Sequence, residues 1–365
     1  MRKIFTLQDD WLFEKEGVRQ NVSIPHTWNA EDGQGTSAYY RGECKYEKHF
    51  AKPEYQPGQR VYLEFRGVNS SARVLVNGKD VAVHDGGYST FRADITEQLK
   101  EKNTLTVYAD NSPNDRVYPQ RADFTFYGGI YRDVYMILVD ETHFDLDFYG
   151  GNGFLVTPKL SGTTAEIVFD AYVTGTAEKV IVTVSDRDGK RIGEVELEKS
   201  GDKYTGSLVI ENVHRWNGVK DPYLYQAAAV VYKNGERCDE VTARFGCREY
   251  RIDPEKGFFL NGESYPLHGV SRHQDRLGVG NALTKEMHEE DMELILSMGA
   301  NSIRLAHYQH DPYFYDLCDE KGVVVWAEIP YITVHMPNGR ENTVQQMKEL
   351  ITQNYNHASI ICWAI

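Results

Sequence analysis

The chain has 365 residues, of which 41% are hydrophobic, 12% aromatic and 26% charged. That length is too great for one ordinary core and predicts two or three domains, while the apolar content excludes a disordered chain. The formal net charge of −14 argues against a nucleic-acid partner, because such proteins need a basic surface to displace counterions.

No run approaches the roughly 18 apolar residues of a membrane span, so no membrane partner is predicted. A signal peptide is also not expected, because Gln8-Asp9-Asp10 interrupts the apolar run that such a peptide needs. The five cysteines are odd in number and form no C-x-x-C pair. This pattern is typical of reduced thiols, and we therefore expect a cytoplasmic protein.

Residues 1–140 have the pattern of a β-sandwich. Asn77-Gly78 is a strong hairpin signal between two alternating runs, and Gly86-Gly87 marks a second turn. The predicted strands are Val61–Phe65, Ala72–Val76, Val81–Val83, Tyr88–Phe91, Leu105–Tyr108 and Asp133–Leu138. We interpret this segment as a jelly roll.

Residues 141–248 are again β, with shorter and more regular spacing. The predicted strands are Ala165–Phe169, Val180–Val184, Val195–Leu197, Tyr204–Ile210 and Gln226–Tyr232. Strand-sized runs separated by turns every 8–12 residues, over about 100 residues, favour an immunoglobulin-like sandwich.

Residues 249–365 change to a β-α-β pattern. Strands are predicted at Tyr265–Val270, Asn301–Leu305, Val323–Trp326 and Ile360–Trp363. Between them lie a helix capped by Thr284 with Met287, Met292, Ile295, Leu296 and Met298 on one side, a helix over Pro312–Lys321, and a helix with Val344, Met347, Ile351 and Tyr355. Apolar strands alternating with helices indicate a parallel sheet covered by helices.

Polar residues follow three of these strands. They are His268 to Arg276, Arg304 to His310, and Glu328. In a (β/α)₈ barrel the active site lies at the carboxyl ends of the strands, so we expect binding groups here. A zinc centre is not predicted, because there is no H-x-H pair at the first strand and no H-E-x-x-H motif.

Two segments resemble the signatures of glycoside hydrolase family 2. The first joins Asn301–Tyr308 to Asp319–Trp326, and Asn356–Ile365 looks like the start of the second. Gly129–Val134 and Phe245–Arg248 are similar to the ends of the family's jelly roll and middle sandwich. The resemblance implies three domains: a sugar-binding jelly roll (1–140), an immunoglobulin-like sandwich (141–248), and the first half of a TIM barrel with about four strands (249–365).

The resemblance implies a substrate-binding set of Asp123, His273, Arg304 and His307. Asp123 matches the jelly-roll carboxylate that holds sugar hydroxyls, and the other three match positions that shape a galactoside pocket. Ser271–Asp275 is more like β-galactosidases than β-glucuronidases. Glu328 is left open between a group that supports the pocket and a buried structural carboxylate.

The family's acid/base Glu follows the second signature and its nucleophile lies on a later strand, so neither stands in this chain and no catalytic residue is predicted here. The resemblance implies a full-length retaining exo-β-glycosidase, a hydrolase for terminal β-galactosides, with this 365-residue polypeptide inactive. The alternatives are a β-glucuronidase or β-mannosidase of the same family, or a non-catalytic carbohydrate-binding protein.

No cofactor is predicted as required. Magnesium is not carried over, because Ile329-Pro330-Tyr331 stands where some members have a magnesium carboxylate, and sodium at Asp123 is left open. Four parallel strands cannot close a barrel, so we expect an apolar open edge at the last strand. A homo-oligomer is one expectation, either through the sandwich domains or through this edge. Without a second copy to cover it, the edge is expected to be disordered or to promote aggregation.

Overall fold

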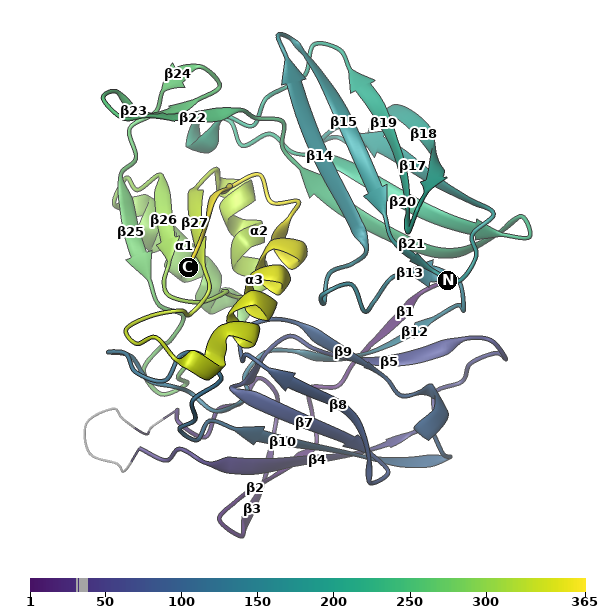
Figure 1. Cartoon of the computed structure of the whole chain (residues 1–365), viewed down its shortest axis with the longest axis vertical. Coiled ribbons are helices and arrows are strands. Elements are labelled where there is room, and N and C mark those ends of the chain that lie inside the picture. The colour runs from purple at the N-terminus through teal and green to yellow at the C-terminus, as the bar shows by residue number, and fades with distance from the viewer. Residues whose placement is uncertain (31, 33–38) are drawn as a thin grey trace.

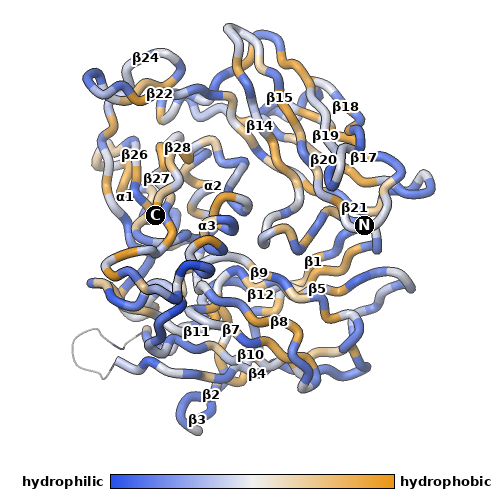
Figure 2. The backbone as a smooth tube through the Cα atoms, viewed as in Figure 1, coloured by the Kyte–Doolittle hydropathy of each residue, from blue (hydrophilic) through white to orange (hydrophobic). Residues whose placement is uncertain are grey.

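The computed structural model describes residues 1–30, 32 and 39–365. Figure 1 shows two β-sandwiches and a third part in which helices cover one side of a parallel sheet. In Figure 2 the hydrophobic segments lie mainly along the strands and the hydrophilic ones at the loops that join them. Among the described residues, no helix has the length and apolar character needed to cross a bilayer.

The first sandwich is a jelly roll made of a six-stranded and a four-stranded sheet. Their strand orders are β3-β2-β4-β10-β7-β8 and β1-β12-β5-β9, and a small pair, β11-β6, lies beside them. The bounds are β1 Lys3–Thr6, β2 Trp11–Lys15, β3 Val18–Val22, β4 Glu43–Ala51, β5 Arg60–Phe65, β6 Val68–Asn69, β7 Ser71–Val76, β8 Lys79–Asp85, β9 Phe91–Asp94, β10 Lys102–Asp110, β11 Gly129–Ile130 and β12 Val134–Val139.

The predicted hairpin at Asn77-Gly78 is confirmed, since β7 pairs with β8 and both turn residues have positive φ. The predicted strand over Tyr88–Phe91 is wrong: β9 begins at Phe91. Tyr88 instead stacks on Tyr308 of the third domain, so the segment before β9 is used for a contact between domains.

The second sandwich is immunoglobulin-like, with strand order β14-β15-β19-β18-β17-β20-β21. Strand β18 joins its two sheets, because its first half pairs with β17 and its second half with β19. The bounds are β13 His143–Phe144, β14 Phe154–Ser161, β15 Thr164–Ala171, β16 Val173–Thr174, β17 Lys179–Ser185, β18 Arg191–Ser200, β19 Lys203–Ile210, β20 Tyr225–Lys233 and β21 Glu236–Phe245.

The third part begins with a small sheet of β22 (Tyr250–Asp253), β23 (Gly257–Leu260) and β24 (Glu263–Ser264). It continues as a half-barrel, a parallel sheet in the order β25-β26-β27-β28. The bounds are β25 Gly269–Arg272, β26 Ser302–Leu305, β27 Val324–Glu328, β28 Ile360–Ala364, α1 Lys285–Ser297, α2 Pro312–Lys321 and α3 Arg340–Asn354. The first strand starts later than predicted, since Tyr265–His268 is outside β25.

The helices cover one face of the half-barrel and leave the other face open. Side chains of α1, α2 and α3 form one core with Ile303, Val325 and Ile360 of the sheet. On the open face, Leu267 and Trp326 are 43% and 47% exposed. Strand β28 pairs only with β27 in the described structure, which agrees with the predicted open edge. What covers this edge stays a prediction.

The local helix signals are confirmed, but one predicted face is not. Thr284 accepts a hydrogen bond from the Met287 amide at the start of α1, and Gly322 ends α2 in the left-handed conformation. The predicted apolar face of α1 is wrong at Met298, which is 67% exposed. His288 is buried on that helix instead, because it contacts a charged cluster described below.

Candidate functional site

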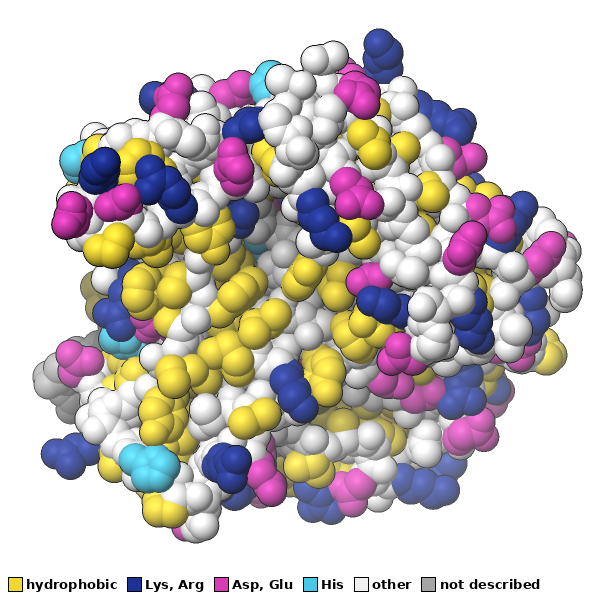
Figure 3. Space-filling model, turned by 45° about the horizontal axis from the view of Figure 1, so that its top comes forward, with side chains coloured by type: hydrophobic (Ala, Val, Ile, Leu, Met, Phe, Trp, Pro, Cys, Tyr) yellow, Lys and Arg dark blue, Asp and Glu magenta, His cyan; other side chains and the backbone are white. Residues whose placement is uncertain are grey.

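The open face of the half-barrel carries a shallow pocket at the middle of its strands. The parallel register aligns Ser271 of β25 with Arg304 of β26, and Arg304 with Trp326 of β27. These side chains line a pocket of about 260 Å³ together with Leu267, Val270 and Ile361. Figure 3 shows hydrophobic side chains gathered in a hollow over this part of the molecule. A half-built barrel interior is therefore open to solvent.

Three polar side chains form a connected group at the carboxyl ends of β26 and β27. The Arg304 guanidinium donates through Nε to Glu328 Oε1 and through Nη2 to Oε2 at 3.1 Å. His307 Nδ1 lies 3.0 Å from Arg304 Nη2 and 3.2 Å from Glu328 Oε2. Glu328 is 4% exposed, so its charge is compensated by Arg304 rather than by water. The group fixes the direction in which Arg304 faces the pocket.

The jelly roll reaches this group through the loop that carries Asp123 and Phe124. The Phe124 ring centroid lies 4.8 Å from that of His273 and 6.0 Å from that of His307, and the two imidazoles lie 5.2 Å apart. Asp123 is exposed next to Phe124 and acts electrostatically on His273. The structure thus brings His273, Arg304 and His307 together, and it packs the jelly-roll loop that carries Asp123 against them through Phe124.

The protonation of His273 follows from this packing. Burial lowers its pKa, and the charge of His307 lowers it further, while Asp275 and Asp123 oppose the shift. His273 Nδ1 lies 3.3 Å from the Tyr308 hydroxyl, which also accepts a hydrogen bond from the Gln274 amide. A neutral imidazole can both donate and accept, which suits a sugar hydroxyl.

The predicted substrate-binding set lacks two residues that line the site, and one residue of the polar segment after β26 lies elsewhere. Phe124 and Tyr308 pack against the two histidines, and their only local signal was their position beside Asp123 and His307. His310, in the polar segment after β26, is fully buried behind the pocket. The difference arises because a loop residue can turn toward either side of the sheet.

The described residues contain no group of three or more His, Cys, Asp or Glu side chains that could hold a metal ion. Glu328, the only acidic side chain in the group at the strand ends, directs both oxygens toward Arg304 and His307. A divalent cation would have to displace these partners. The residues present therefore do not fit a magnesium site at Glu328.

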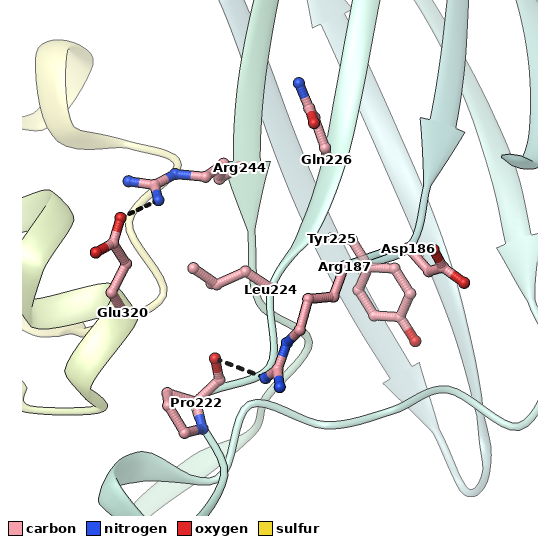
Figure 4. A pocket seen from close by; sticks show the side chains of 8 residues that line it. All are labelled: Asp186, Arg187, Pro222, Leu224, Tyr225, Gln226, Arg244 and Glu320. Atoms are coloured by element: carbon pink, nitrogen blue, oxygen red, sulfur yellow. Dashed lines mark hydrogen bonds and ion pairs between the residues drawn. The ribbon is translucent and has the colours of Figure 1, made fainter. Parts of the chain in front are cut away.

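A second pocket, of about 470 Å³, lies between the immunoglobulin-like sandwich and α2 (Figure 4). Its charges compensate one another, since Arg244 pairs with Glu320 and Asp316, and Arg187 donates to the Pro222 carbonyl at 3.4 Å. It lies at the end of α2 that precedes β27, near the amino ends of the barrel strands. Active sites of this fold lie at the opposite edge, so we assign the site to the open face.

Comparison with known families matches the chain in three consecutive segments. Residues 20–127 match the family described as glycosyl hydrolase 2 galactose-binding domain-like, and residues 152–248 match glycosyl hydrolases family 2. Residues 252–365 match the TIM barrel domain of glycosyl hydrolases family 2. Together the three segments account for most of the chain.

Among curated proteins, a β-glucuronidase of Bacteroides fragilis is 42% identical over all of this chain and 56% of its own length. A β-galactosidase of Thermoanaerobacter pseudethanolicus is 30% identical over all of this chain and 51% of its own. Among solved structures, an FMN-binding β-glucuronidase from Facaelibacterium prausnitzii L2-6 has a TM-score of 0.96 at 42% identity, covering 100% of this chain and 58% of that one.

The chain therefore spans about half the length of the curated relatives that it matches. The matched part contains the jelly roll, the immunoglobulin-like sandwich and the first strands of the barrel, in the same order as in the family. On these matches, and on the three-domain fold that positions the four pocket residues, the chain belongs to glycoside hydrolase family 2.

Proposed function

We propose that this chain forms the sugar-binding half of the active site of an exo-β-glycosidase. The observation that carries the proposal is that the jelly-roll loop with Asp123 and Phe124 packs against His273 and His307, next to Arg304, at the carboxyl ends of the half-barrel strands. A carboxylate, a guanidinium and two imidazoles supply the hydrogen-bond donors and acceptors that the hydroxyl groups of a sugar require. Two domains must hold together for this set to exist.

Glycoside cleavage with retention needs two carboxyl groups about 5–5.5 Å apart, one as acid and one as nucleophile. We assign Glu328 to neither role, because Arg304 and His307 occupy both of its oxygens. We therefore propose that the residues described here bind and orient the sugar. The acid and the nucleophile belong to the remaining barrel strands of a longer family member.

For the substrate we propose a terminal β-glucuronide, with a β-galactoside as the second candidate. The first rests on the relatives of 42% identity, which are β-glucuronidases. The second rests on the Ser271–Asp275 motif and on the β-galactosidases at 30% identity. The sequence alone favoured the galactoside, and the comparisons support only the coarser assignment to a glycosidase family.

The test is binding of methyl β-D-glucuronide and methyl β-D-galactoside to the purified chain, measured by calorimetry. We expect glucuronide to bind more tightly, and Asp123→Asn to weaken binding about tenfold through loss of a charge-assisted hydrogen bond. Asp188→Asn, which changes an exposed carboxylate in the turn after β17, is the matched control and should bind as the parent does.

Absence of binding to either sugar, or equal loss in both variants, would contradict the proposal. The purified chain should also leave nitrophenyl β-glucuronide and nitrophenyl β-galactoside intact, because we assign no acid or nucleophile among the described pocket residues; measurable hydrolysis would refute this. We further propose a reducing compartment such as the cytoplasm, since none of the five cysteines forms a disulfide.

A further inference from the structure

A buried charged cluster lies behind the pocket, on the helix-covered side of the half-barrel. Arg272, at the end of β25, is 7% exposed and donates through Nε to Asp291 of α1 at 3.0 Å. Its Nη2 also reaches Asp291 and lies 3.1 Å from His288 Nδ1, and its guanidinium covers the Phe314 ring at 3.9 Å. These contacts fix the guanidinium in one orientation.

His310 connects this cluster to the loop that follows β26. Its Nδ1 lies 3.1 Å from Arg272 Nη1, which can only donate, so Nδ1 is the acceptor. The proton is then on Nε2, which donates to the Ala306 carbonyl at 3.0 Å. Burial, followed by the charge of Arg272, holds the pKa of His310 well below its usual range. The imidazole is therefore neutral and keeps this single tautomer.

Ala306 is held from both sides by these residues. Its amide donates to the Arg272 carbonyl at 3.1 Å, and its carbonyl accepts the His310 bond. The next residue is His307, whose imidazole contacts Arg304 and Glu328 in the pocket. A continuous set of contacts thus runs from Asp291 through Arg272, His310 and Ala306 to His307.

We propose that Arg272 and His310 are positioning residues of the sugar pocket, which act by holding the Ala306 peptide and thereby the His307 imidazole against Arg304 and Glu328. Neither residue faces the open side of the sheet. The consequence for sugar binding rests on the function proposed above, whereas the effect on His307 does not. The competing explanation is that the cluster only stabilises the fold.

Asp291 provides a matched pair of variants, because its two oxygens serve two arginines. Oδ2 pairs with Arg272, and Oδ1 pairs with Arg276 at 2.6 Å. Asp291→Asn weakens both pairs. Arg276→Gln removes the Oδ1 pair, with the bonds of Arg276 to Glu290 and to the Met287 carbonyl, and leaves the Arg272 pair in place. The readouts are the imidazole resonances of His307, assigned with His307→Gln, and the affinity for methyl β-D-glucuronide.

We expect Asp291→Asn to shift the His307 resonances and to weaken sugar binding about fivefold, the equivalent of one hydrogen bond. Arg276→Gln should leave both readouts at the parent values. Equal shifts in the two variants, or no shift of His307 in either, would overturn the proposal, because the cluster would then act on stability alone.

Two replacements of His310 test the Ala306 bond itself. His310→Gln retains a donor at the distance of Nε2, whereas His310→Asn retains an acceptor near Nδ1 and loses that donor. The proposal requires Gln to preserve the His307 resonances and Asn to shift them; the reverse order would overturn it. The His307 resonances can be measured without sugar. If the chain bound neither glycoside, the proposed function would be contradicted, but the comparison of the two His310 variants would still test the positioning role.

Discussion

At the scale of single residues, the carboxylate of Glu328 organises the pocket. It stands at the end of β27 and is almost fully buried. Arg304 of the neighbouring strand β26 compensates its charge, and His307, in the loop after β26, contacts the same oxygen. An ionised carboxylate in such a place is tolerated only when charge and hydrogen bonds compensate it. Its role is therefore to orient the side chains of Arg304 and His307 toward the open face.

Glu328→Gln tests this role. We expect sugar affinity to fall about tenfold, because the amide lacks the negative charge and one of the two acceptor oxygens that hold Arg304 and His307. The free energy of unfolding should fall by only about 1 kcal/mol, since the Arg304 side chain is 45% exposed. Glu320→Gln, which breaks the Arg244 pair far from the pocket, is the control. Calorimetry and urea unfolding measure both effects. Unchanged affinity in Glu328→Gln would contradict the assigned role.

At the scale of elements, α3 buries a different face from the one its apolar residues predict. Val344 and Tyr355 are 48% and 38% exposed, whereas the buried residues are Gln346, Glu349, Leu350 and Asn354. The reason is that α3 lies between the half-barrel and the jelly roll. Backbone groups of the jelly-roll loops need hydrogen bonds on the side that faces them, and polar side chains of α3 supply these bonds.

Gln353 is the most heavily bonded of these side chains. It accepts a hydrogen bond from the Thr90 amide at 3.0 Å and donates to the carbonyls of Thr90 and Tyr149, each at 2.9 Å. Gln353→Leu should lower the free energy of unfolding by about 2–4 kcal/mol, because these backbone groups lose their partner. Gln345→Leu is the control, since Gln345 bonds Glu349 of its own helix. Equal urea midpoints for the two variants would contradict this account.

At the scale of the whole molecule, both sandwiches hold the half-barrel through buried polar contacts. Arg132 of the jelly roll donates to the Gln309 carbonyl at 2.8 Å, and Trp216 of the second sandwich donates to the Asp319 carbonyl at 2.9 Å. Asp319 in turn accepts from the Ser359 amide at 2.8 Å and pairs with His357 at 2.7 Å, just before β28. The last strand is thus tied to α2 by one carboxylate.

The His357–Asp319 pair predicts a pH dependence of stability. Burial lowers the pKa of His357, but the charge of Asp319 and its hydrogen bond raise it by more, so the net shift is upward. A raised folded-state pKa stabilises the fold at pH values below the unfolded pKa, and this contribution disappears as pH rises through the folded pKa.

We therefore expect the unfolding free energy of the parent, minus that of His357→Gln, to decrease from pH 6 upward. Urea titrations at several pH values measure this difference. The contributions of the other titrating groups cancel in it, because they are the same in both proteins. A difference that is constant or grows with pH would show that the pair carries no protonation linkage.

The sequence by itself determined the elements and their order. Alternation of apolar residues, Asn77-Gly78, Thr284 and Gly322 act over a few residues, so strands, turns and caps are encoded where they occur. The candidate pocket residues were also predicted, but through resemblance to a family and not through geometry. Neither the contacts of Phe124 nor those of Glu328 followed from local pattern.

Tertiary structure alone decided which faces are buried and which charges meet. Arg304 and Glu328 are 24 residues apart and pair only because β26 and β27 are parallel neighbours. His310 turns to Arg272 behind the sheet and not into the pocket, and Gln353 of α3 faces the jelly roll, where it bonds the Thr90 backbone. Such choices depend on partners distant in sequence, and a buried polar group takes the position in which those partners compensate it.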